Sequence, residues 1–111
     1  MALKRVARSA TVVLKDGRFV AQPPEGWIVW GSDGRVVPPP GTYRISHTGI
    51  VVQKRTSAGR FVTVEGDLVT IESGEAIAAD YRNDGDVLMV ELIPPLLRKI
   101  FARLAGWLPW R

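Results

Sequence analysis

Short runs in which apolar and polar residues alternate fill most of the chain, and turn-forming residues separate them. The runs are residues 11–15, 18–22, 27–30, 36–37, 43–46, 50–54, 61–65, 68–72 and 87–93. Alternation with a period of two places one set of side chains on each face of a strand, so each run predicts a half-buried β-strand. The spacing predicts a mainly β fold, an antiparallel β-sandwich or partly open barrel of seven to nine short strands.

The residues between the runs predict how the strands connect. Asp16-Gly17 separates two runs by two residues, which is a strong hairpin signal because glycine accepts a positive φ. Residues 56–59, 66–67 and 83–86 have the composition of further hairpin loops. Pro38-Pro39-Pro40 lacks three consecutive amide donors, so it cannot lie inside a sheet and predicts a crossing between two layers.

Two segments depart from simple alternation of apolar and polar residues. Residues 73–81 are rich in alanine, which favours a helix, but their short length and their neighbours favour a strand, and we predict a strand. Residues 87–93 are the most apolar run of the chain, which predicts a central strand.

The pattern changes after residue 93, where apolar residues recur at helical spacing and predict a C-terminal amphipathic helix that Pro109 ends. Its apolar side consists of Leu97, Phe101, Leu104 and Leu108, widened by Leu96, Ile100 and Trp107, and Trp110 follows. Its polar side carries Arg98, Lys99 and Arg103. We therefore divide the chain into a β domain, residues 1–93, and a basic helical tail, residues 94–111.

Charge separates the same two parts. The chain has a formal net charge of +4, and residues 92–111 hold four basic residues and no acid, so the body is neutral. A cationic, apolar segment of this kind suits a groove in a partner protein or the headgroup zone of an anionic membrane. The simpler alternative is a helix that covers one face of its own sheet.

Length and composition limit the class of protein. The 111 residues are one domain's worth of chain, and 46% hydrophobic with 23% charged residues is ordinary globular usage. The absence of cysteine excludes disulfides and thiolate metal sites. The basic start is followed by too short an apolar run for an export signal, and no run is long enough to span a bilayer. We expect a cytoplasmic protein or a component of a virion or another large assembly.

Residues capable of catalysis or metal binding form no recognisable pattern. His47 is the only histidine, and we expect it to be a strand residue that packs or hydrogen-bonds at a sheet edge. The segment from Asp80 to Glu91 matches a calcium-binding loop in part, but Arg82 occupies a ligand position and a β pattern follows, so we expect a hairpin turn. We predict no enzyme activity and no cofactor.

Basic and aromatic residues offer two further candidate surfaces. Lys54, Arg55 and Arg60 surround a predicted hairpin loop, a possible secondary basic patch, but no aromatic residue lies among them and nucleic-acid binding is not favoured. Trp27 and Trp30 lie an odd number of residues apart, so one points outward unless both faces of their strand are covered. An exposed tryptophan beside Tyr43 could form a sugar-stacking platform or a protein contact, but we expect these aromatic residues to contribute to a sandwich core and to be partly buried at the surface.

These patterns favour a non-catalytic structural or assembly subunit whose helix anchors it to a larger protein assembly, for instance as an accessory or decoration protein of a phage or virus particle. The expected partner is another protein or a second copy of the chain. One alternative is a peripheral membrane protein that binds anionic bilayers through the same helix. A second alternative is a carbohydrate- or nucleic-acid-binding β module.

Overall fold

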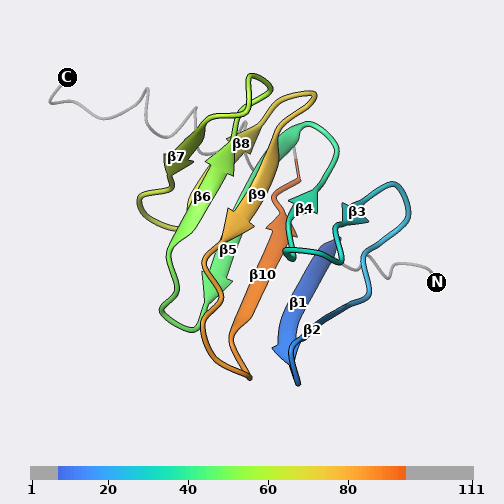
Figure 1. Ribbon diagram of the computed structural model, residues 1–111. Helices are drawn as coiled ribbons and strands as arrows, with labels where there is room; N and C mark the ends of the chain where they lie inside the picture. Colours follow the sequence, from blue (N-terminus) through green and yellow to red (C-terminus); the bar gives the residue numbers. More distant parts are fainter. Residues whose placement is uncertain (1–7, 95–111) are drawn as a thin grey trace, which may run out of the picture.

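The fold consists of two antiparallel five-stranded sheets that face each other (Figure 1). It is seen in a computed structural model that describes residues 8–94. The strands are β1 (Ser9–Lys15), β2 (Arg18–Ala21), β3 (Ile28–Val29), β4 (Val36–Val37), β5 (Gly41–His47), β6 (Val52–Arg55), β7 (Phe61–Thr63), β8 (Leu68–Ile71), β9 (Ala76–Ala79) and β10 (Val87–Leu92). The prediction of a mainly β sandwich is confirmed for this part of the chain.

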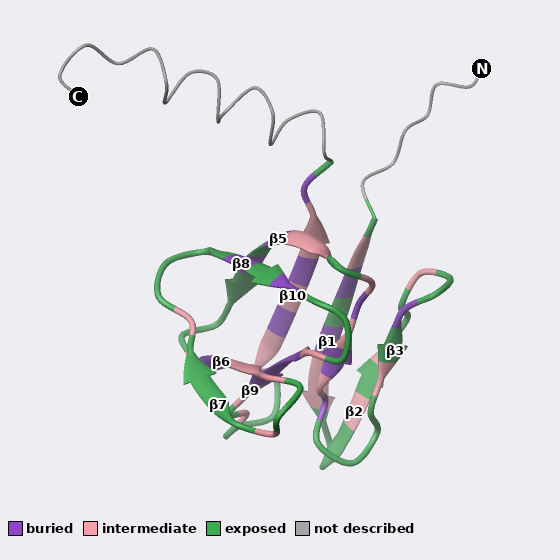
Figure 2. Ribbon diagram, turned by 90° about the horizontal axis from the view of Figure 1, so that it is seen from above, coloured by how far each residue is buried: buried purple, intermediate pink, exposed green. Residues whose placement is uncertain are grey.

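The strand order is that of a jelly roll. Sheet A has the order β2-β1-β10-β5-β8 and sheet B the order β3-β4-β9-β6-β7. From β4 onward the chain crosses between the sheets at every connection except the β6–β7 hairpin. This gives two facing four-stranded sheets, β1-β10-β5-β8 and β4-β9-β6-β7, with β2 and β3 added at one side. Figure 2 shows the two layers and the buried residues that face the space between them.

Local sequence explains several of these elements. Asp16 and Gly17 both have positive φ, 53° and 77°, as the two-residue turn between β1 and β2 requires. The predicted strand in residues 73–81 is confirmed as β9, and the predicted central strand is β10, which pairs with β1 and β5. The three prolines lead from β4 in sheet B to β5 in sheet A, as predicted.

The core is made by the inward half of each alternating strand. The most deeply buried side chains are aliphatic or aromatic, and no polar or charged residue among those described is buried. They include Val12, Val36, Ile71, Ile77, Leu88 and Val90. Burying a side chain of this size contributes about 1.5–3 kcal/mol relative to leaving it exposed, so this double layer of apolar residues is the main stabilising feature of the fold.

Two aromatic residues join the sheets near the proline segment. Trp27 and Tyr43 are both buried, and their rings meet edge to face with centroids 5.3 Å apart. The Tyr43 hydroxyl donates a hydrogen bond to the Pro39 carbonyl, and burial raises the pKa of Tyr43. Tyr43 therefore holds the layer crossing in place. It is part of the core, so it cannot form an exposed platform with a tryptophan, and the expected core packing is what the structure shows for Trp27 and Tyr43.

A second aromatic pair packs against the loop between β3 and β4. Phe19 and Tyr81 pack with ring centroids 4.9 Å apart, and the Tyr81 hydroxyl donates to the Gly34 carbonyl at 3.3 Å. Gly34 has φ +74°, and a Cβ there would lie 2.8 Å from carbons of both rings. Glycine is required at this position both by its backbone conformation and by the close approach of the rings.

Two connections and the strand count differ from the predictions. Residues 66–67 and 83–86 are not hairpin tips, because β7 and β8, and likewise β9 and β10, lie in different sheets. A turn has the same residue chemistry whether the next strand pairs with the previous one or crosses to the other layer. Residues 8–94 form ten strands, and the expected strand over residues 27–30 is reduced to Ile28–Val29.

The predicted C-terminal helix lies outside the described residues. The two described ends lie next to each other, since the Leu92 amide donates to the Arg8 carbonyl at 2.8 Å. Among residues 8–94, no helix is long and apolar enough to cross a membrane.

Candidate interaction surface

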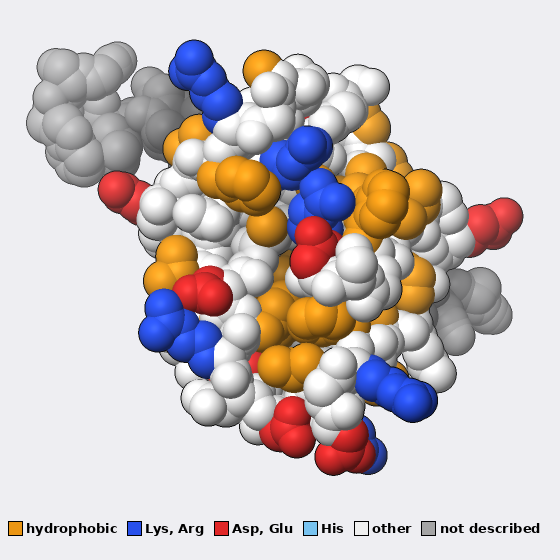
Figure 3. Space-filling view, viewed as in Figure 1, with side chains coloured by type: hydrophobic (Ala, Val, Ile, Leu, Met, Phe, Trp, Pro, Cys, Tyr) orange, Lys and Arg blue, Asp and Glu red, His pale blue; other side chains and the backbone are white. Residues whose placement is uncertain are grey.

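The outer face of sheet B carries large apolar side chains in contact with solvent. Ile28, Trp30, Val51 and Phe61 are 57%, 48%, 47% and 53% exposed. Their outward direction follows from the strand register, because Val36 and Val52 point into the core. Val51 beside Val52, Ile28 opposite Val37 and Phe61 opposite Arg55 therefore point out, and Trp30, two residues after Ile28, lies on the same side. In Figure 3, hydrophobic side chains gather in patches over this face, with charged side chains between and around them.

A shallow groove of about 350 Å³ runs across this face. Ala78 lies on its floor and is buried, because its side chain is short and longer neighbours surround it. The groove is lined by Asp33, Arg35, Val51, Gln53, Phe61, Ala78, Ala79 and Asp80. Its lining therefore combines an apolar side from β7 and the start of β6 with a polar side from the loops around β4 and β9.

Charges along the groove are compensated locally. Arg35 Nε lies 2.9 Å from Asp33 Oδ2, and the Arg35 guanidinium stacks 5.0 Å from the centre of the Trp30 ring. Asp80 accepts two hydrogen bonds from Arg82, at 2.8 and 3.0 Å. The ion pair and the cation–π contact orient Trp30 beside the groove while leaving almost half of its surface exposed.

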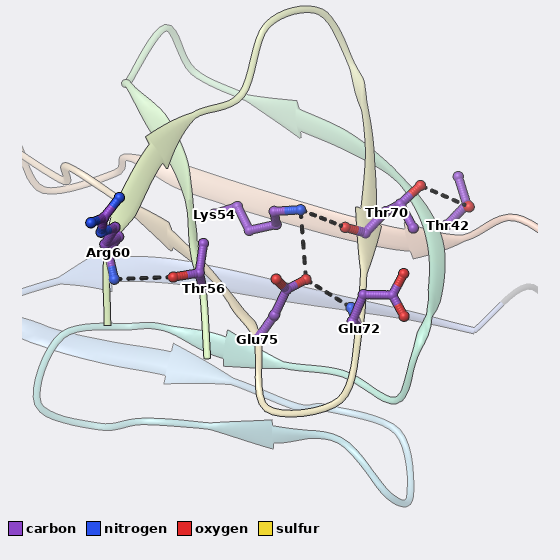
Figure 4. Close-up of polar contacts among 7 residues, drawn as sticks. All are labelled: Thr42, Lys54, Thr56, Arg60, Thr70, Glu72 and Glu75. Carbon is purple, nitrogen blue, oxygen red and sulfur yellow. Dashed lines mark hydrogen bonds and ion pairs between the residues drawn. The ribbon is translucent and has the colours of Figure 1, made fainter. Parts of the chain in front are cut away.

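The β8 edge of sheet A is protected by an ion pair that links the two sheets (Figure 4). Lys54 on β6 reaches across to donate to the Thr70 carbonyl of β8 at 3.2 Å, and its Nζ lies 3.6 Å from Glu75. Glu75 in turn accepts the Glu72 amide at 2.8 Å. Two backbone groups along the β8 edge are thereby occupied, which is a known way to prevent further strand pairing.

This arrangement separates the three residues of the possible basic patch. Lys54 faces inward toward sheet A and is paired with Glu75. Arg55 lies on the outer side of β6 opposite Phe61, and Arg60 precedes β7. Of the three, Arg55 and Arg60 form no ion pair with any residue in the part of the chain that the structure describes.

The residues weighed for catalysis or metal binding have local structural partners. His47 Nδ1 accepts the Gly49 amide at 3.0 Å. Asp86 accepts the Arg82 and Asn83 amides at 2.9 Å and the Thr48 hydroxyl at 3.1 Å. The amide hydrogen bonds, Asn83 first, lower the pKa of Asp86 below its usual value. Residues 8–94 contain no group of three or more His, Asp or Glu arranged to hold a metal ion.

The sequence predicts this surface only in part. The odd spacing of Trp27 and Trp30 correctly separated a buried from an exposed tryptophan. Val51 and Phe61 were missed, because an alternating pattern does not tell which face of a strand is covered. The site residues expected on the tail lie outside the described range: Leu97, Arg98, Lys99, Ile100, Phe101, Arg103, Leu104, Trp107, Leu108 and Trp110.

No protein-family model, no curated protein and no solved structure matches this chain.

Proposed function

We propose that this protein is a non-catalytic assembly module whose jelly-roll body binds another protein through the outer face of sheet B. The observation that carries the proposal is the group of half-exposed apolar side chains, Ile28, Trp30, Val51 and Phe61, on one face of one sheet. Several large apolar side chains exposed on one face of a domain, with polar residues around them, are typical of a protein contact. A tryptophan and a phenylalanine are the residue types that most often dominate such contacts.

The polar residues around these side chains fit the same role. Arg35 stacks on Trp30 and is paired with Asp33, so the ring is oriented before a partner binds. Side chains that are already ordered lose less conformational entropy on association. The local charge compensation leaves apolar contact as the main contribution to affinity, and the polar groups would supply orientation.

The C-terminal tail is the second part of the proposal. Its apolar residues Leu97, Phe101 and Leu104, with Arg98 and Lys99 beside them, would anchor the module in the same assembly. A phage or virus particle is one assembly of this kind, and jelly rolls are common in capsid proteins, although a shared fold alone does not assign a function.

The test uses the tagged full-length chain in the cells that produce it. The unaltered protein should elute from gel filtration of a gentle extract in a complex much larger than its own mass. The double variant Val51→Glu with Phe61→Glu should elute as the isolated chain, because burying two carboxylates in an apolar contact is unfavourable. The matched control is Val20→Glu, since Val20 is 52% exposed on β2 of the other sheet.

Two results would contradict the proposal. One is elution of the unaltered chain alone. The other is a complex that tolerates the double variant as well as it tolerates Val20→Glu. A parallel flotation of the purified chain with vesicles rich in anionic lipid separates protein binding from the membrane alternative. Tail-dependent flotation without any protein complex would favour the membrane.

One observation favours carbohydrate binding as a second candidate function. Trp30 is half exposed beside a groove that also presents Asp33, Gln53 and Asp80, and sugars bind to proteins by stacking on aromatic rings and hydrogen-bonding to such groups. Quenching of tryptophan emission by soluble oligosaccharides, lost in Trp30→Ala, would support this candidate. Emission that no oligosaccharide changes would exclude it for the sugars tested.

A further inference from the structure

Strand β7 has an open edge, and the hydrogen bonds of its neighbour show which backbone groups lie along it. The Val64 amide donates to the Val52 carbonyl at 2.9 Å, and the Thr56 amide donates to the Arg60 carbonyl at 2.8 Å. In an antiparallel pair, hydrogen-bonded and non-hydrogen-bonded positions alternate. Val62 therefore bonds toward β6, while the amides and carbonyls of Phe61 and Thr63 point away from it, along the edge.

The two free edges on this side of the sandwich are treated differently. On β8, the Lys54 ammonium and the Glu75 carboxylate occupy backbone groups of Thr70 and Glu72 (Figure 4). On β7, all three residues are exposed. No side chain within residues 8–94 hydrogen-bonds to the edge-facing groups of Phe61 or Thr63.

We propose that β7 pairs with β7 of a second copy of this chain, antiparallel across a two-fold axis, so that two sandwiches share one continuous sheet. Placing Val62 opposite Val62 of the other copy sets each Phe61 opposite a Thr63. The edge-facing groups of Phe61 and Thr63 then form four hydrogen bonds between the copies. The two valines, each 50% exposed in the single chain, cover one another.

Charge supports a second copy as the occupant of this edge. Arg60 immediately precedes β7 and Glu65 follows it two residues after its end, and both are exposed. Antiparallel pairing about a two-fold axis sets Arg60 opposite Val64 of the other copy, one position from its Glu65, so residues of opposite charge meet at each end of the contact. An isologous contact requires such self-complementarity. This pairing uses the backbone edge of β7, whereas the proposed function uses side chains on the outer face of sheet B. Phe61 belongs to both surfaces, so the pairing is tested at Val62, which is not on the outer face.

The experiment is sedimentation velocity of the full chain over a hundredfold range of concentration, from about 10 µM to about 1 mM, because a three-residue pairing makes a weak dimer. The unaltered chain should shift from monomer to dimer across this range. Val62→Lys should remain monomeric, since it sets two ammonium groups opposite each other at a Cβ separation of about 5 Å. Val62→Thr is the matched control that keeps a β-branched side chain and should still dimerise.

A proline series tests the backbone directly. Thr63→Pro removes an amide that faces the open edge and leaves the bonds to β6 in place, so it should abolish the dimer. Leu68→Pro is its control on the β8 edge. The Ile45 amide bonds to the Asp67 carbonyl at 2.7 Å, which sets the Leu68 amide pointing away from β5, and this variant should dimerise normally.

Hydrogen exchange measured by NMR provides a readout that does not depend on any variant. The Phe61 and Thr63 amides should exchange at least about tenfold more slowly where the dimer dominates, a change of about 1.4 kcal/mol, while the Leu68 amide should not change. A chain that is monomeric at all concentrations, a dimer that survives Val62→Lys, or equal protection of Leu68 would each overturn the proposal.

Discussion

Replacing Gly34 with alanine should destabilise the protein more than the same change at a glycine of similar backbone conformation. Gly34 has φ +74°, and an alanine in the left-handed region costs about 1–2 kcal/mol. The new Cβ would also lie 2.8 Å from ring carbons of both Phe19 and Tyr81. Forcing extra atoms into packed surroundings costs a further 1–3 kcal/mol or so. The expected total is about 2–5 kcal/mol.

The control isolates the contribution of packing. Gly26 has φ +88°, and a Cβ there meets nothing within 4 Å, so Gly26→Ala should lose only the backbone contribution, about 1–2 kcal/mol. Thermal unfolding followed by circular dichroism should therefore place the Tm of Gly34→Ala roughly 5–20 °C below that of Gly26→Ala. Equal losses for the two variants would refute the argument that the Phe19–Tyr81 pair encloses Gly34.

Three further predictions concern the core, the β8 edge and acid stability. Leu88→Ala should lower the free energy of unfolding, measured in urea, by about 2–5 kcal/mol, because Leu88 is fully buried. Leu68 is 49% exposed, so Leu68→Ala should lower it by less than about 1 kcal/mol. Similar losses for the two variants would contradict the assignment of the core. Lys54→Met should lower the free energy of unfolding by less than about 1 kcal/mol, because the ion pair is partly solvated. It should nevertheless increase aggregation on storage, measured by light scattering, because it frees the β8 edge. Unchanged scattering would contradict a protective role of Lys54. The pKa of Asp86 in the folded protein lies below its usual 3.8, so its carboxylate stabilises the fold above pH 3.8, and this stabilisation is lost as the pH falls through the folded pKa. Asp86→Asn should therefore lose less stability than the unaltered chain when the pH is lowered. An equal dependence of the unfolding free energy on pH in the two proteins would disprove this contribution of Asp86.

The sequence was sufficient for the parts of the fold that depend on local chemistry. Alternation identified the strands, Asp16-Gly17 identified the β1–β2 turn, and the three prolines identified a layer crossing. It was insufficient for strand order, because the turns at 66–67 and 83–86 contain the same residues that a hairpin would use. Only the packing of whole sheets decides whether a strand pairs with its predecessor or crosses to the other layer.

The candidate surface was harder to predict for the same reason. Phe61 and Val51 have the composition of core residues, and they are exposed because sheet B places them on its outer face and β7 at its edge. The pairing of Lys54 with Glu75 joins residues of separate elements and depends on the approach of the two sheets. A basic cluster in the sequence was therefore divided by the fold, and an apolar surface was created by it.

Site-specific photo-crosslinking in the cells that make the protein tests the central claim most directly. A photoreactive phenylalanine analogue at position 61 or 51 should give a discrete adduct with a protein other than a second copy of the chain after irradiation of intact cells. The same analogue at position 20, which is equally exposed on the other sheet, should give none. Adducts of equal yield from all three positions, or no protein adduct from positions 61 and 51, would contradict the assignment of the outer face of sheet B as the binding surface.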